Sequence, residues 1–361
     1  MKKSYLLLKE LGYLDVDIER VLNSYSISRI NEEKLYNNII DVYNFLSKYY
    51  TVEEIKKMAI LFPTLLCLNA LNLEKKIDDL IKLGYTKKQV IKMCRMFPAL
   101  FGYNIITIKA KLDYLVGLGY SYCEILKLTY KVPSLIAMSS EIFNNKIDFF
   151  ISLGYTKEEI IHMSLKFPEL LCFSSTHLLN TFKLLKSIGY SEDNIRKMTY
   201  FCPAIYTYST KHILNRFNFL KGLGYTDNQV IDITISLPAI FGYSDKNLLD
   251  KIRYYKEIGL SDLIIIKPKI LMQSIELSYA RYEYMKTKNI VINIKNYRKL
   301  IVEQSKFVSS YGINNDDIKI MYPIGSYLDN LGNKYILKTL YQLDPNFSCN
   351  NSVKSITYKK R

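Results

Sequence analysis

The chain has 361 residues, of which 50 are Lys or Arg and 34 are Asp or Glu, so it carries a net charge of about +16 at neutral pH. Hydrophobic residues make up 49% of it, enough to offset the entropy of ordering and to argue against intrinsic disorder. No apolar run approaches the ~20 residues that a membrane-spanning helix needs. The six cysteines form no CxxC pair and there are only three histidines, so we expect neither a disulfide scaffold nor a metal site.

Residues 1–48 are expected to form a helical N-terminal cap. Apolar residues recur at helical spacing between Asn31 and Lys48, which predicts a helix there. Leu11-Gly12-Tyr13 looks like the end of a repeat that precedes all the others.

A repeat of 35 residues follows this segment. It is marked by two sets of residues at that spacing: Gly84, Gly119, Gly154, Gly189, Gly224 and Gly259, and Pro63, Pro98, Pro133, Pro168, Pro203 and Pro238. Six successive repeats therefore run from about Tyr49 to Ile258, and a degenerate seventh begins at Gly259. We number them repeats 1 to 7.

Each repeat opens on a signal for a helix start. Two residues after the glycine position stands Ser or Thr, and in five of the first six repeats the residue three further on is Glu or Gln. This spacing predicts a capping box, in which the two side chains satisfy free amides at the helix start. The residue before the cap is a tyrosine in all six, at Tyr50, Tyr85, Tyr120, Tyr155, Tyr190 and Tyr225. We interpret these tyrosines as hydrophobic staples.

The proline ends this first helix after about ten residues, because it lacks an amide donor. A short apolar link and a second helix follow, and the next glycine closes the repeat in a left-handed conformation. Neither helix can bury its apolar stripe alone, so the repeats must stack. We therefore predict an all-α fold: a right- or left-handed α-solenoid of about seven helix-turn-helix repeats, with helical caps. The array is expected over residues 49–290, C-terminal capping helices over 291–345 and a basic flexible tail over 346–361.

The repeat pattern L-G-Y-[ST]-x-x-x-[IV]-x-x-M-x-x-x-x-P-x-[LI] resembles that of the mitochondrial transcription termination factor (mTERF) family. Its clearest instance runs from Leu153-Gly154-Tyr155-Thr156 through Met163 to Pro168. The segment from Ser274 through Arg281 looks like the end of the family's array, although Ala280 replaces the usual proline. The resemblance covers roughly residues 49–310.

The resemblance implies a non-enzymatic helical superhelix that binds double-stranded DNA or structured RNA along a basic groove. Such proteins terminate or regulate transcription, or assist RNA maturation in organelles. No phosphate-binding loop, nucleophile elbow or zinc-protease motif is present in the sequence, and we expect no cofactor and no small-molecule substrate. We expect a monomer that does not enter a membrane. With no room for a transit peptide before Leu11, we expect a cytoplasmic protein; the alternative is a mitochondrial or plastid chain whose transit peptide is missing.

Basic residues recur at two phases of the repeat, as a phosphate-binding solenoid requires. The first column lies eight residues after the glycine position, and neighbours three or four residues away extend it: Lys57, Lys92, Arg95, Lys127, Lys131, Lys166 and Lys197. The second column lies on the second helix, twenty-seven residues after the glycine position: Lys76, Lys111, Lys146, Arg216 and Lys251. We expect both columns to line a groove and neutralise phosphates, with limited sequence reading because Lys is a point charge.

Four alternatives stay open. The lysine columns could be a solvated face, and the array could be a scaffold for another protein, as most unrelated α-solenoids are. Arg281 could contact nucleic acid or could bond to the C-terminal cap. Tyr103, Tyr208 and Tyr243 could stack on unpaired bases, but packing between repeats is the favoured interpretation.

Overall fold

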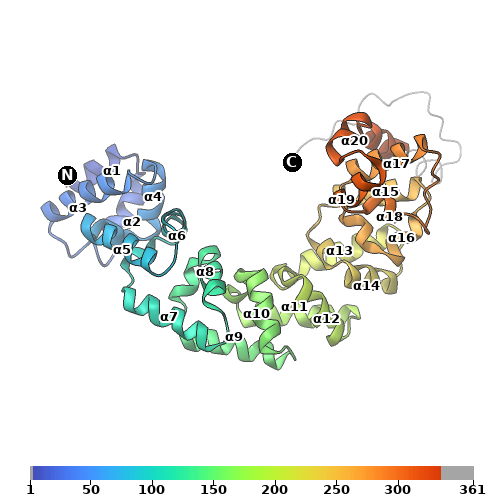
Figure 1. Ribbon diagram of the computed structural model, residues 1–361. Helices are drawn as coiled ribbons and strands as arrows, with labels where there is room; N and C mark the ends of the chain where they lie inside the picture. The colour runs from blue at the N-terminus through green and yellow to red at the C-terminus, as the bar shows by residue number, and fades with distance from the viewer. Residues whose placement is uncertain (1–2, 335–361) are drawn as a thin grey trace. The chain divides into compact units, whose positions relative to one another are not determined.

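The computed structural model describes residues 3–334, which fold into helices and turns without a strand (Figure 1). The predicted all-α class is confirmed. The tail predicted over 346–361 and the end of the predicted C-terminal cap lie outside the described residues. No helix within residues 3–334 is both long and apolar enough to cross a membrane.

The described residues divide into two compact parts. The first part holds residues 3–182 together with Thr199–Thr207. The second part holds Lys183–Met198 and residues 208–334. Each part is described here by itself.

Every repeat contains a first helix, a short 3-10 helix and a second helix. The first helices are α4 (Val52–Leu61), α6 (Lys87–Met96), α8 (Tyr122–Lys131), α10 (Lys157–Lys166), α12 (Glu192–Phe201), α14 (Asp227–Ser236) and α16 (Ser261–Ile266). The second helices are α5 (Ala70–Lys82), α7 (Ile105–Gly117), α9 (Ser140–Ser152), α11 (Ser175–Ile188), α13 (Thr210–Gly222), α15 (Asp245–Glu257) and α17 (Ile275–Thr287). The repeating helix pairs predicted from the sequence are therefore present.

The 3-10 helices stand where the sequence predicted only an apolar link. They are η1 (Pro63–Cys67), η2 (Pro98–Gly102), η3 (Pro133–Ala137), η4 (Pro168–Cys172), η5 (Pro203–Thr207), η6 (Pro238–Gly242) and η7 (Pro268–Met272). Each begins at its proline, where the missing N–H costs nothing because the first amides of a helix have no intrahelical partner. The apolar residues of the link, such as Leu170 and Leu171, are buried.

The helix-start signals form as predicted. Complete capping boxes begin α4, α6, α8, α10 and α14. In each, the side-chain oxygen of the Ser or Thr accepts a hydrogen bond from the backbone N–H of the Glu or Gln, whose own side chain accepts one from the backbone N–H of the Ser or Thr. In repeat 5, where Asn194 replaces the Glu or Gln, the bond from Asn194 N to Ser191 Oγ (3.2 Å) remains. At the other end of the repeat, glycines such as Gly119 (φ 106°) take the left-handed conformation. Asn289 (φ 56°) takes it at the end of repeat 7.

The N-terminal segment is built like one more repeat. After α1 (Lys3–Glu10), Gly12 has φ 84°, and α2 (Asp15–Leu22) and α3 (Glu32–Leu46) stand where the two helices of a repeat would be. Turns replace the proline and the 3-10 helix between them. Beyond repeat 7 the period is lost, and α18 (Arg298–Ile301), α19 (Gln304–Tyr311) and α20 (Asn315–Met321) follow, with α20 packed on α17.

The staple tyrosines also join successive repeats. Tyr120 is 2% exposed, and its hydroxyl lies 2.7 Å from Ser164 Oγ of the next repeat. Because Ser164 Oγ donates to Ile161 O (2.8 Å), the tyrosine hydroxyl must be the donor in this pair. The same bond, between residues 44 apart, joins Tyr85 to Thr129, Tyr155 to Thr199 and Tyr190 to Thr234, each at 2.6 Å.

We expect Tyr120→Phe to lower the free energy of unfolding by about 1 kcal/mol, since it removes one buried hydrogen bond and leaves the ring in place. The measurement is the shift of the urea denaturation midpoint. Tyr25→Phe is the matched control, because Tyr25 is 73% exposed. Equal midpoints for the two variants would contradict a stabilising role for this bond.

Candidate nucleic-acid interface

The first basic column lies on the surface. Lys57, Lys92, Lys127, Lys197 and the neighbouring residues Arg95, Lys131 and Lys166 are all exposed. Each projects from a first helix whose opposite side carries the buried residues of the repeat, such as Met93 in α6 and Leu128 in α8. The 35-residue period therefore returns a cation to the same side of α4, α6, α8, α10 and α12.

Successive first helices contact each other in the first part of the chain, α6 with α8 and α8 with α10. The cations of the first basic column on these three helices form what we call the basic stripe: Lys92, Arg95, Lys127, Lys131 and Lys166. Lys57 lies on α4, before the stripe. Lys197 lies in the second part, where Asp232 interrupts the column before Lys267.

Most of the stripe is free of acidic partners. Among the described residues, Lys92, Lys127, Lys131 and Lys166 make no ion pair within 4.0 Å. Arg95 differs, since its guanidinium lies 2.6 Å from a Glu54 carboxylate oxygen.

Aromatic rings of the next repeat hold two of the stripe's ammonium groups. Lys92 Nζ lies 5.0 Å from the ring centroid of Tyr130, and Lys166 Nζ lies 5.9 Å from that of Phe201. A cation over an aromatic face gains electrostatic attraction without losing its charge. These lysines are therefore oriented while remaining able to meet an anion.

The second column is buried, which differs from the expectation that both columns line an open groove. Exposure is 9% for Lys76, 8% for Lys111, 5% for Lys146, 4% for Arg216 and 6% for Lys251. Their long aliphatic stems pack between repeats, and the charged ends bond to the next repeat. This column therefore joins repeats.

Three of the five side chains in the second column bond to the next repeat in the same way. Lys76, Lys146 and Arg216 donate to the backbone carbonyls that follow the next 3-10 helix, those of Tyr103, Phe173 and Tyr243. Lys251 donates to Leu271 O at 2.7 Å, and Lys111 donates to Ser140 Oγ at 3.3 Å. Arg216 also pairs with Asp245 at 2.7 Å. Burial lowers the pKa of all four lysines in this column.

Arg281 bonds to the C-terminal helices, as expected for the second of the two roles left open for it. The residue is fully buried, and its guanidinium donates to Leu300 O (3.0 Å), Val302 O (2.7 Å) and Asn315 Oδ1 (2.7 Å). It also lies 4.2 Å from the ring centroid of Phe307. Burial lowers the pKa of Arg281 to about 10, so the group stays protonated at neutral pH. These contacts favour a structural role over contact with nucleic acid.

Two of the other aromatic candidates contact rings of their own repeat, and the hydroxyl of Tyr208 also lies beside Gly242 of the next repeat. The ring of Tyr103 lies 6.1 Å from that of Phe97, and the ring of Tyr208 lies 4.7 Å from that of His212. Tyr103, Tyr208 and Tyr243 are all half-buried. No group of three His, Cys, Asp or Glu side chains within residues 3–334 could hold a metal ion.

Sequence reasoning missed the hydroxyl partners of the tyrosines. Thr129, Ser164, Thr199 and Thr234 recur with the 35-residue period on the buried side of the first helices. A polar residue that returns at the same phase of an apolar face was the available signal.

The family model for mTERF matches the chain twice, over residues 1–153 and again over 146–308. The chain belongs to the mTERF family. Membership suggests a helical-repeat protein that binds nucleic acid, and the family is not typically enzymatic. The mTERF match begins at residue 1, in agreement with the repeat-like build of α2 and α3. No curated protein matches the sequence.

Proposed function

We propose that this mTERF protein binds double-stranded DNA or structured RNA along its basic stripe, and that it regulates or terminates transcription through this binding. The observation that carries the proposal is the stripe itself, a set of exposed cations on contacting helices with almost no acidic partners. Such cations can replace the counterions condensed on a phosphate backbone, and the release of those counterions favours binding. Family membership supports the same partner.

Phosphate contacts are expected to supply most of the affinity. Four of the five stripe residues are lysines, and the single arginine, Arg95, is held by Glu54. A lysine offers a point charge and no planar fork for bidentate contact with a base edge. We therefore expect modest discrimination between base sequences by the stripe.

The one acidic side chain of α8, Glu124, is occupied by the helix cap. The Glu124 carboxylate accepts from Ser121 N at 2.9 Å and from Ser121 Oγ at 2.8 Å. These bonds lower the pKa of Glu124, so the carboxylate is charged at neutral pH and complements the start of α8. The negative charge of α8 thus sits at its first turn, while Lys127 and Lys131 carry the positive charge further along the helix.

The proposal predicts a steep salt dependence. If the stripe neutralises about four phosphates of a duplex, the logarithm of the association constant falls with the logarithm of salt concentration with a slope of about −4. Affinity for a duplex or a structured RNA should then drop by about a hundredfold or more between 50 and 200 mM salt. Filter binding with the full chain at several salt concentrations measures this slope. An affinity that does not change with ionic strength would contradict the proposal.

A scaffold for another protein is the second candidate function, because apolar side chains are exposed at the start of three second helices. Leu71 in α5 is 76% exposed, Ile106 in α7 is 74% and Ile142 in α9 is 53%. Exposed apolar groups on contiguous elements are a feature of protein contact sites. Absence of nucleic-acid binding by the full chain at low salt would favour this function.

A further inference from the structure

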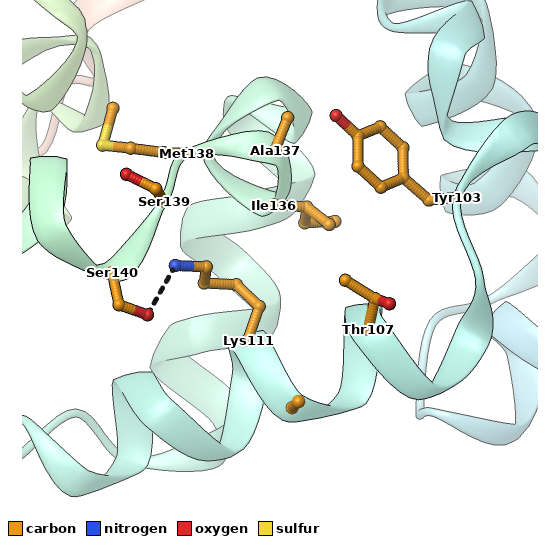
Figure 2. Close-up of a pocket in the computed structure, with 9 residues that line it drawn as sticks. Tyr103, Thr107, Lys111, Ile136, Ala137, Met138, Ser139 and Ser140 are labelled. Carbon is orange, nitrogen blue, oxygen red and sulfur yellow. Dashed lines mark hydrogen bonds between the residues drawn. The ribbon is translucent and has the colours of Figure 1, made fainter.

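Two pockets occupy the same place in successive repeats of the first part. One has a volume of about 270 Å³ and is lined by Thr107 and Lys111 of α7 and by Ser139 and Ser140 at the start of α9 (Figure 2). The other has a volume of about 350 Å³, and its corresponding lining residues are Asn72, Lys76, Asn104 and Ile105. A shift of 35 residues converts each of these positions into its counterpart. The pocket thus recurs at the same phase of two successive repeats.

Each pocket contains a buried lysine that makes no ion pair. Lys76 is 9% exposed and Lys111 is 8% exposed, and neither makes an ion pair with a described residue. Asp79 also lines the larger pocket, where its charge offsets part of the effect of burial on the pKa of Lys76, while its carboxylate lies 3.6 Å from Lys82 Nζ. A buried ammonium is costly unless it is paired, and burial accordingly lowers the pKa of both lysines.

Both ammonium groups keep donors in reserve. An ammonium has three N–H groups. Lys76 donates to one acceptor, Tyr103 O, and Lys111 donates to one, Ser140 Oγ, as Figure 2 shows for the latter. Both acceptors are neutral, and Lys111 Nζ also lies 4.8 Å from the ring centroid of Tyr114. Each ammonium therefore has N–H groups beyond the one hydrogen bond that it donates.

A helix start lies beside each lysine and adds positive potential, although the first turn of α9 also carries Glu141. Helices α7 and α9 have 13 residues each, and their N-caps Asn104 and Ser139 are pocket residues. The cap satisfies one first-turn amide, at 2.8 Å for Ile106 N and 3.2 Å for Ile142 N. The remaining first-turn amides have no intrahelical partner and favour an anion.

We propose that each of these two pockets binds one phosphate group. The lysine ammonium would hold one phosphate oxygen, and the first-turn amides and the N-cap side chain would hold another. A phosphodiester carries a single negative charge, which matches the single positive charge of the buried lysine. The phosphate comes from the backbone of a bound strand or from free phosphate ion, and the backbone source rests on the function proposed above.

The variant Lys76→Gln with Lys111→Gln tests the proposal in the full chain. Glutamine keeps a donor for the neighbouring acceptor and removes the charge, and circular dichroism with a thermal melt checks the fold. If backbone phosphates occupy both pockets, the salt slope of nucleic-acid binding falls by about 1.8 for a duplex or about 1.4 for a single strand. Lys251→Gln is the matched control, since Lys251 is equally buried but lines neither pocket, and it should leave the slope unchanged.

The second arm uses inorganic phosphate alone as the probe, followed by broadening of its ³¹P resonance. Broadening by the wild type that the double variant lacks, with unchanged salt slopes, assigns the pockets to free phosphate. Broadening by a wild type that binds no nucleic acid overturns the proposed function and supports the pockets. An unchanged slope together with unchanged broadening in the double variant overturns the pocket proposal. So does an effect that Lys251→Gln reproduces. If the double variant misfolds, the charge-conserving pair Lys76→Arg and Lys111→Arg replaces it, and a folded pair that neither broadens the phosphate resonance nor keeps the wild-type salt slope overturns the proposal.

Discussion

Reversing the charge of four stripe residues should weaken nucleic-acid binding by about a hundredfold or more at 100 mM salt. The variant carries Lys92→Glu, Lys127→Glu, Lys131→Glu and Lys166→Glu. Each change removes a cation that makes no ion pair with a described residue and places a carboxylate where we propose that a phosphate binds. Fold stability should change little, because all four side chains are exposed.

The matched control has the same total charge at different positions: Lys34→Glu, Lys82→Glu, Lys109→Glu and Lys157→Glu. These lysines are also exposed, and all four lie outside the stripe. Long-range electrostatics alone would weaken both variants to the same degree, whereas local contacts predict a much larger loss in the stripe variant. Gel shifts with a duplex and with a structured RNA measure both. Equal nucleic-acid affinities of the wild type and the stripe variant would contradict binding along the stripe and would favour a protein scaffold.

The repeat and its boundaries could be predicted from the sequence because they depend on local chemistry. A Thr followed three residues later by Glu, as in Thr156 and Glu159, forms a capping box through bonds within one helical turn, so it does not depend on tertiary contacts. The glycine period depends on backbone conformation in the same local way, as Gly154 (φ 88°) illustrates. The two helices of each repeat follow directly from these signals.

The 3-10 helices could not be predicted in the same way. A run such as Glu169-Leu170-Leu171 is too short for its periodicity to separate an extended link from a tight helix. What favours the 3-10 form is the burial of Leu170 and Leu171 together, and this depends on the neighbouring repeats.

The two basic columns have the same period, and the sequence alone could not tell which of them is exposed. Lys92 and Lys111 each belong to a column that recurs every 35 residues, yet Lys92 is exposed whereas Lys111 is only 8% exposed. The difference arises because the stem of Lys111 is covered by the following repeat, whose residues are distant in sequence. The sequence therefore predicted that basic residues recur at these two phases, while the packing of neighbouring repeats determines which column is exposed and which is buried.

Arg281→Leu should destabilise the C-terminal helices by about 3 kcal/mol. Its guanidinium donates to three acceptors that face the protein interior, and hydrogen bonds from a charged group contribute about 1.5 to 3 kcal/mol each. Leucine replaces the apolar volume and removes the cost of burying a charge, which offsets part of the loss. The carbonyls of Leu300 and Val302 are left without this donor, and unsatisfied buried acceptors are costly.

Hydrogen exchange of residues 298–321 measures this effect, because Arg281 holds α18 and Asn315 of α20 against α17. A loss of about 3 kcal/mol corresponds to amide exchange faster by roughly a hundredfold in that segment, with little change in the first part of the chain. Arg281→Lys should recover part of the protection, since an ammonium reaches fewer of the three acceptors. Arg298→Leu, at an exposed position of α18, is the control and should leave the exchange unchanged. Wild-type nucleic-acid affinity in a destabilised Arg281→Leu variant would agree with a structural arginine; lost affinity with unchanged protection would contradict it.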